Sequence, residues 1–348
     1  MAYTTINKPS DYFKTQAYTG SGSTKSISSL NFQPDWVWIK SRNSTAWHNL
    51  YDSVRGATKD IYSNATDVEG TNTNRLTSFD SNGFSVGNDS DVNADGTQYI
   101  SWNWKANGTG VSNTDGDITS TVSANTTTGF SIVKYTGNGS NDQRIGHGLG
   151  VRPVCWMIKR LDTADDWVVY HHGIASNWYD DTYLYLNSTN GLMGAVNTGT
   201  GNPTSSVFYI GNSAKTGASG GEYIAYVFAE KTGFSKFDSY IGDGDTDGQF
   251  IYTGFKPAFV MYKKVSASGN DWIMADRVRA SAVNPLNKEL YANSNSTEGT
   301  VNLLDFTSNG FKLRRSHASQ NENGAKYIYM CFAKSPLVAS NNVPATAR

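Results

Sequence analysis

The chain has 348 residues, a formal net charge of −1, and only 17% charged against 13% aromatic residues. It has no long Lys/Arg run to neutralise phosphates, so a nucleic-acid partner is not expected. No apolar stretch approaches the roughly 20 residues that span a bilayer, and the first residues lack the apolar segment of a signal peptide, so we expect neither membrane insertion nor secretion.

The predicted elements occur in the same order three times along the chain. Each copy opens with a strand that ends in Tyr-x-Gly, at residues 17–20, 134–137 and 239–242. A proline and an apolar run follow at 32–40, 151–159 and 255–263, with the prolines 119 and then 104 residues apart. A period of roughly a hundred residues is too long for one solenoid turn, so each copy is predicted to be a small domain.

The apolar run after each proline is almost continuous, which is typical of a strand covered on both faces. A tryptophan strand comes next, and its tryptophans follow the prolines by 13, 14 and 15 residues: Trp47, Trp167 and Trp272. A bulky indole at a matched place in every copy predicts a core residue, whose truncation typically costs about 3–5 kcal/mol.

A Tyr-x-Asn strand end follows at 62–64, 185–187 and 291–293, then a hairpin at 81–86, 205–210 and 308–313. The Asn-Gly pairs of the first and third hairpins are strong turn signals. Each copy closes with a strand, at 99–106, 223–230 and 327–334. The expected fold is all-β: three tandem antiparallel β-sandwich modules of about 100 residues, of a jelly-roll or lectin-like type. An immunoglobulin-like topology is the alternative.

These positions predict the domain organisation. The repeats are placed at 1–108, 129–232 and 233–338, with a linker at 109–128 and a tail at 339–348. The linker is rich in Asn, Thr, Ser and Gly, as expected of a flexible or strand-exchanging connection. Cys155 and Cys331 lie in apolar runs of different repeats, so they are expected to be buried free thiols.

One acidic loop has the beginning of a calcium-binding pattern. Asp243, Asp245 and Asp247 match the first half of an EF-hand loop, but Gly254 stands where a bidentate Glu is required. The sequence favours a plain acidic turn and no cofactor, with Ca²⁺ as the alternative. His147, His171 and His172 are not repeated as histidines in the other copies, which favours structural roles over metal binding.

A second loop combines aromatic and acidic residues, namely Trp178, Tyr179, Asp180 and Asp181. A flat apolar face beside polar groups suits a glycan, which makes this loop a candidate glycan-binding site; burial in a domain interface is the alternative. Neighbouring acidic residues on a strand point to opposite faces, so these pairs do not suit glycoside hydrolysis. No enzyme activity is expected.

The repeated segments resemble an uncharacterised repeat family of virion structural proteins from marine tailed bacteriophages. The resemblance rests on residues 129–137, 146–153, 166–170, 305–313 and 327–330. It implies a structural component at the particle surface, such as a tail fibre, another appendage or a capsid decoration protein. It supplies no catalytic residues.

The resemblance also implies other virion proteins as partners and assembly as a homo-oligomer, with a trimer as one form. The alternative function is a receptor-binding module for a bacterial surface glycan. A particle protein of this kind would be made in the host cytoplasm.

Overall fold

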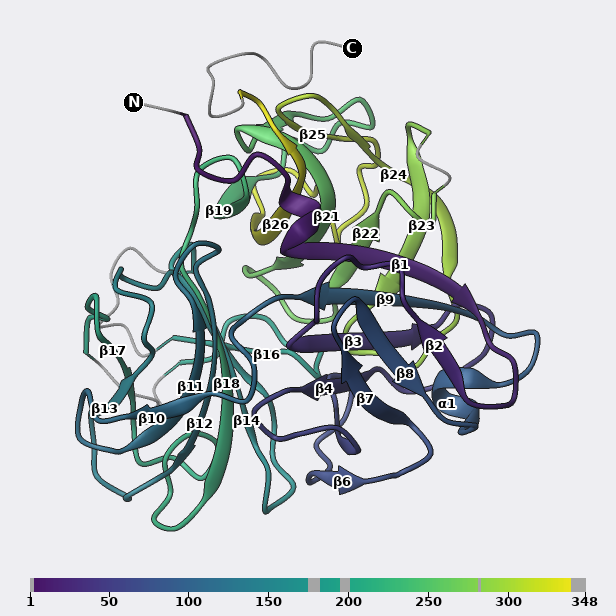
Figure 1. Ribbon diagram of the computed structural model, residues 1–348. Helices are drawn as coiled ribbons and strands as arrows, with labels where there is room; N and C mark the ends of the chain where they lie inside the picture. Colours follow the sequence, from purple (N-terminus) through teal and green to yellow (C-terminus); the bar gives the residue numbers. More distant parts are fainter. Residues whose placement is uncertain (1–2, 175–181, 195–200, 281–282, 339–348) are drawn as a thin grey trace.

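The computed structural model describes residues 3–174, 182–194, 201–280 and 283–338. In these residues the fold is nearly all β, with several antiparallel sheets, as Figure 1 shows. The expectation of an antiparallel β fold is therefore confirmed. None of the helices in the described part of the chain is long and apolar enough to cross a membrane.

The first repeat forms one large and one small sheet. Its elements are η1 (Pro9–Asp11), β1 (Phe13–Thr19), β2 (Lys25–Ile27), β3 (Trp36–Ser41), β4 (Asn49–Asp52), β5 (Lys59–Tyr62), β6 (Gly70–Thr71), β7 (Leu76–Asp80), β8 (Gly83–Val86), α1 (Ser90–Asn93) and β9 (Gln98–Trp104). The six-stranded sheet has the order β1-β9-β3-β4-β5-β6, and the small sheet has the order β2-β8-β7.

The second repeat has the same plan. Its elements, with those of the preceding segment, are β10 (Val111–Asn113), β11 (Ser120–Asn125), β12 (Phe130–Thr136), β13 (Gln143–Gly146), β14 (Cys155–Arg160), β15 (Val168–His171), β16 (Leu184–Tyr185), β17 (Val207–Ile210) and β18 (Glu222–Phe228). The large sheet has the order β10-β11-β12-β18-β14-β15-β16, beside the pair β13-β17. Segment 109–128, expected to be a linker, thus adds two strands to this sheet.

The third repeat joins its strands into one eight-stranded sheet. Its elements are β19 (Ser235–Ile241), β20 (Phe250–Tyr252), β21 (Phe255–Lys264), β22 (Ile273–Asp276), β23 (Leu286–Tyr291), β24 (Gly299–Phe306), β25 (Gly310–Leu313) and β26 (Lys326–Pro336). The order is β19-β26-β21-β22-β23-β24-β25-β20. In all three repeats the opening strand therefore pairs with the closing strand, and the closing strand pairs with the proline strand.

A tyrosine at the start of each closing strand fixes the loop before it. Tyr99, Tyr223 and Tyr327 stack on the opening-strand tyrosines at centroid distances of 5.2, 5.2 and 5.0 Å. Each hydroxyl donates to the carbonyl nine residues earlier and accepts from the amide five residues earlier. The repeated tyrosine is thus a structural residue that satisfies two main-chain groups of an irregular loop.

The proline strands bury both faces, which confirms the expectation from their continuous apolar sequence. Trp36 and Trp38 contribute to one apolar cluster, whereas the alternating residues Val37 and Ile39 contribute to another. β14 and β21 divide their residues in the same way. Each repeat has its own cluster, but the other strand faces of all three repeats form a single shared core. Each repeat thus has an interior of its own, and a fourth interior joins the three repeats.

Cys155 belongs to the shared core and Cys331 to the cluster of the third repeat. Both are buried free cysteines, as expected.

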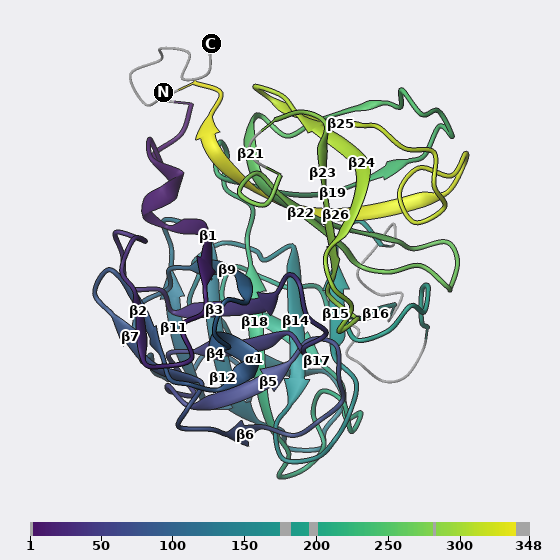
Figure 2. The same cartoon turned by 90° about the vertical axis from the view of Figure 1, so that its right-hand side faces the viewer.

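Hydrogen bonds connect the repeats beside the shared core. Trp167 Nε1 donates to the carbonyl of Tyr62, and Trp272 Nε1 donates to the carbonyl of Tyr185, both at 2.8 Å. Ser63 Oγ donates to the carbonyl of Ala292 at 2.6 Å. The first and second, second and third, and first and third repeats are therefore all in contact, as the two views in Figures 1 and 2 also show.

We expect Tyr223→Phe to lower the free energy of unfolding by about 1–3 kcal/mol, because it leaves two loop groups without their partner. Tyr209→Phe is the matched control, since the half-buried Tyr209 lies on the small β13-β17 sheet. Urea denaturation measures both variants. Equal stability of the two variants would contradict the role of the repeated tyrosine.

We expect His171 to make the stability depend on pH. Its Nδ1 accepts from the amide of Gly173 and its Nε2 donates to the carbonyl of Tyr329 at 3.0 Å. Burial is the main cause that lowers the pKa of His171 to about 3. The unfolded state, with a histidine pKa of about 6.5, therefore takes up a proton below that pH while the folded state does not.

The free energy of unfolding should consequently fall as the pH drops from 6.5 towards 3. Between pH 7 and 5 this histidine should account for about 2 kcal/mol of the loss. Urea denaturation of wild type and His171→Gln at both pH values measures that difference. An unchanged pH dependence in the variant would contradict this account.

Candidate carbohydrate-binding site

The tryptophan strand begins in the same way in all three repeats, and His48 occupies in the first repeat the position of Trp167 and Trp272 in the others. β4, β15 and β22 begin directly after His48, Trp167 and Trp272. The main-chain amide of each is bound by the side-chain oxygen of the Tyr-x-Asn asparagine, at 2.8–2.9 Å. His48 is buried and accepts from Trp38 Nε1 at 2.8 Å. The core position thus belongs to His48, and the prediction of a buried Trp47 is wrong.

Trp47 lies on the surface, with 38% of its area exposed. Its ring meets the ring of Tyr62 nearly edge to face, at a centroid distance of 4.7 Å and an angle of 77°. The second and third repeats have Asp166 and Asp271 at this place, and each accepts from the Tyr-x-Asn asparagine. The repeat framework therefore uses an aspartate here, and the exposed indole is a feature of the first repeat alone.

A cavity of about 340 Å³ lies beside Trp47. Its lining combines the aromatic pair with polar groups of the first and third repeats: Thr45, Ala46, Trp47, Tyr62, Arg75, Asp91 and Asn295. The main-chain bond from Glu298 to the carbonyl of Arg42 and the ion pair between their side chains, at 2.8 Å, hold the two repeats together near Asn295. The cavity is thus formed by segments far apart in the sequence.

Arg75 organises the polar side of this cavity. Its guanidinium lies 5.6 Å from the centroid of Tyr62 and pairs with Asp60 at 2.6 Å and Asp91 at 2.5 Å. Burial raises the pKa of Asp91, and the nearby charge of Arg75 opposes that shift. Burial, followed by the charge of Asp60, raises the pKa of Tyr62 to about 12. At neutral pH Tyr62 therefore keeps its hydroxyl proton.

This arrangement suits a sugar ring. The faces of pyranose rings are apolar and stack on exposed indoles, while carboxylate, guanidinium and amide groups bind hydroxyls. Asp91 and Asn295 supply acceptors, and Arg75 and Asn295 supply donors. The cavity thus combines an aromatic face with hydrogen-bond donors and acceptors.

The sequence did not predict this site, because the repeats were aligned by their tryptophans and not by the distance of each residue from its proline. His48 and Trp167 both follow their prolines by 14 residues, and Trp272 follows by 15. Aligning the repeats by that spacing would have left Trp47 one residue outside the core. The contribution of Asn295 depends on contact between the first and third repeats, which no local pattern encodes.

The loop of Trp178, Tyr179, Asp180 and Asp181 lies outside the described residues, so its predicted glycan role stays a prediction.

The acidic loop of Asp243, Asp245 and Asp247 is described, and its carboxylates have protein partners. Asp243 Oδ1 accepts from the amide of Asp245, and Asp245 Oδ1 from that of Asp247, at 3.0 and 2.9 Å. Asp247 pairs with Arg314 and Lys312. Within the described ranges no group of three His, Cys, Asp or Glu side chains is placed to hold a metal ion.

The three histidines considered for metal binding contact main-chain groups instead. His147 lies near the carbonyl of Thr204, at 3.3 Å, and His172 binds the carbonyl of Phe237 at 2.6 Å. With the contacts of His171 already described, these residues serve the packing of loops and repeats.

Comparison with protein families gives a match over almost the whole chain, as residues 8–336 match a domain of unknown function, DUF7483. The chain belongs to the DUF7483 family. The matched region includes all three repeats, so the DUF7483 domain corresponds to the set of repeats and not to one of them. Among curated proteins, no sequence matches this chain.

We expect Trp47→Ala to lower the free energy of unfolding of this DUF7483 protein by only about 1 kcal/mol, since the residue is 38% exposed and its ring packs edge to face on Tyr62. Trp167→Ala should cost about 3–5 kcal/mol, because that indole is buried in the shared core. Chemical denaturation compares the two. Similar losses would contradict the assignment of Trp47 to a surface site.

Proposed function

We propose that this DUF7483 protein is a structural, non-enzymatic component of a tailed-phage particle, and that it acts at the particle surface as a tail fibre or another appendage. The observation that carries this proposal is the use made of the repeated residues. The recurring tyrosines bind loop main-chain groups, and the recurring asparagines bind the amides at the strand starts. Most of the recurring indoles lie in the shared core. The resemblance to phage virion proteins supports the same reading.

The proposal includes a finer architecture. Each repeat is taken as a β-sandwich module of the jelly-roll or lectin-like type. In the first two repeats the large sheet would face the small sheet across the repeat's own cluster, and in the third the two halves of the eight-stranded sheet would do so. The shared core would then hold the three modules together as a rigid unit. Such rigidity suits a particle component that transmits or withstands force, whereas an enzyme commonly needs a mobile segment over its site.

The proposed partners are other virion proteins and further copies of this chain, with a trimer as the assembly to test first. No cofactor and no nucleic acid enter the proposal. Capsid decoration is the alternative position in the particle.

A second function is favoured by the exposed indole. The cavity of Trp47, Arg75, Asp91 and Asn295 would bind a glycan on the bacterial surface, so that the same protein serves attachment. The two roles are compatible, because a tail fibre can be both a structural part and a receptor-binding part.

Mass spectrometry of purified virions tests the structural role. We expect the protein in the particle at a fixed ratio to the other virion proteins. Absence from purified particles, with the protein present in the infected lysate, would contradict the proposal.

Glycan arrays and adsorption to host cells test the second role with the purified protein. Trp47→Ala should lower glycan binding at least about tenfold, since stacking and the displaced water contribute together. Phe250→Ala, which removes an exposed aromatic ring of the third repeat, is the matched control and should bind like wild type. Unchanged binding in Trp47→Ala would exclude this cavity as the glycan site.

A further inference from the structure

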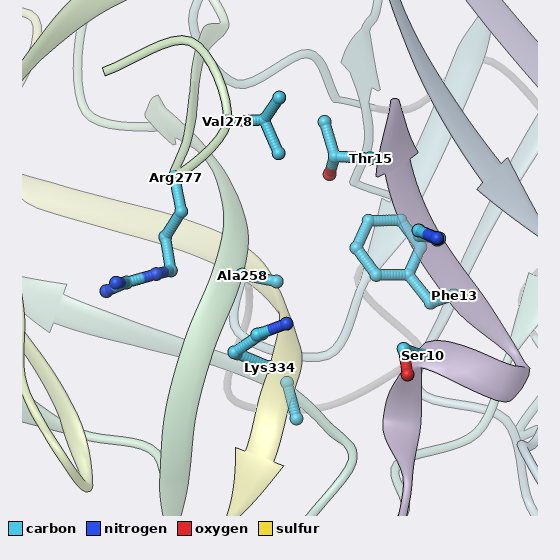
Figure 3. A pocket seen from close by; sticks show the side chains of 9 residues that line it. Ser10, Phe13, Thr15, Ala258, Arg277, Val278 and Lys334 are labelled. Atoms are coloured by element: carbon cyan, nitrogen blue, oxygen red, sulfur yellow. The ribbon is translucent and has the colours of Figure 1, made fainter. Parts of the chain in front are cut away.

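A second cavity lies at another part of the contact between the first and third repeats, and Figure 3 shows it from close by. Its volume is about 350 Å³. The lining comes from η1, β1, the turn after β22, and the strands β21 and β26: Ser10, Phe13, Lys14, Thr15, Ala258, Arg277, Val278, Ala333 and Lys334.

The cavity coincides with a departure from the repeat pattern. The strand pairing places Thr15 opposite Trp102, Ile132 opposite Tyr226, and Phe237 opposite Met330, so Thr15, Ile132 and Phe237 occupy equivalent positions. Ile132 and Phe237 are fully buried in the shared core. Only the first repeat has a small polar residue here, and the volume that Ile or Phe would fill is open.

Thr15 also carries a polar atom that the protein does not satisfy. The side chain is 6% exposed, and its hydroxyl is buried without a hydrogen-bond partner. Buried hydroxyls nearly always have a partner, so an unpaired one in a cavity wall indicates a place for a ligand atom or a water. Figure 3 shows Thr15 and Val278 at one end of the space and Lys334 and Ser10 at the other.

The apolar wall is continuous with the shared core. Phe13 packs on Phe332 and Trp104 at centroid distances of 4.9 Å, and these rings belong to the shared core. Ala258 lies at a register shift of β21, between Pro257 and Phe259, which are paired with consecutive residues of β26. Such bulges bend a strand and often lie next to binding sites.

Three basic residues, Lys14, Arg277 and Lys334, are part of the lining. Lys334 makes no ion pair with an acidic side chain among the described residues. Burial, and then the charges of Lys334 and Lys8, lower the pKa of Lys14. Burial, and then Arg277 and Lys334, lower the pKa of Lys256. The cations therefore repel one another across the two repeats, and a bound anion would relieve that repulsion.

We propose that this cavity binds a small amphipathic carboxylate, such as a medium-chain carboxylic acid. The carboxylate pairs with the ammonium group of Lys334 at the end near Ser10, and the hydrocarbon chain lies against Phe13, Ala258 and Val278. The Thr15 hydroxyl lies at the opposite end of the space, beside the end of the hydrocarbon chain, and takes a water as its hydrogen-bond partner there. This site is separate from the Trp47 cavity and does not depend on the proposed function.

Isothermal titration calorimetry of the full-length protein with sodium octanoate tests the proposal. Wild type should bind saturably, with a Kd of about 1 mM or lower. Thr15→Ile restores the residue type of the second repeat, so it should fill the cavity and abolish binding while keeping or raising the thermal stability. Lys334→Gln should weaken binding at least about fivefold. Lys25→Gln, a lysine of β2 outside the cavity, is the matched control and should bind like wild type.

Octylammonium, which has the same chain and the opposite charge, should not bind. Absence of octanoate binding to the folded wild type would overturn the proposal, and so would binding that neither Thr15→Ile nor Lys334→Gln changes. Binding of octylammonium as tight as that of octanoate would overturn the role of the positive charge.

Discussion

The shared apolar core is the constraint on which the rest of this structure depends. Each proline strand has one face in the cluster of its own repeat and the other in the core common to all three. A strand buried on both faces has no surface on which polar residues are tolerated without partners, which explains its nearly continuous apolar sequence. No repeat can withdraw from this core without exposing rings such as Trp36, Trp167 and Phe332. The three repeats are therefore expected to unfold together, although the sequence suggests separate domains.

Near the ends of the proline strands, at the edge of the shared core, polar contacts join one repeat to the next. The proline strands contain fully buried lysines, Lys40, Lys159 and Lys263, and burial is the main cause that lowers the pKa of each to about 8. The ammonium groups of Lys159 and Lys263 donate to carbonyls of the preceding repeat, those of Thr66 and Thr189, both at 3.1 Å. A buried ammonium with several carbonyl acceptors tolerates little displacement of those acceptors, so these lysines fix the position of one repeat relative to the next. A lysine at a strand end is an ordinary surface residue by sequence, and only the contact between repeats gives it this role.

Much of the fold was accessible from the sequence because its signals are local. Strand runs, glycine turns and the spacing of repeated landmarks predicted antiparallel sheets, buried cysteines and strands covered on both faces. The contact of the first repeat with the third was not accessible, since it joins residues such as Arg42 and Glu298 that no short pattern relates. The same limit applies to both cavities, each of which combines segments of these two repeats. For Trp47 the signal existed in the equal spacing of His48 and Trp167 from their prolines, but residue similarity concealed it. The segment 109–128 has a linker's composition, yet its short alternating patches pair with the edge of a sheet that was already present.

The three repeats can be compared with one another position by position. A residue that the fold requires recurs in all three, whereas a different residue in one repeat calls for another explanation. Two departures in the first repeat leave a physical cost in the fold. Trp47 exposes an aromatic ring where an aspartate would bind its asparagine, and Thr15 leaves a hydroxyl unpaired where Ile or Phe would fill the core. Each departure lies in the wall of a cavity, and both cavities are at the contact with the third repeat. Neither residue makes the contact that the framework residue makes in the other repeats, and a ligand that covers the indole or fills the space beside Thr15 would offset that loss. Each residue that gives up a stabilising framework contact therefore lies in a cavity wall, which is the physical reason to expect ligands at the contact between the first and third repeats.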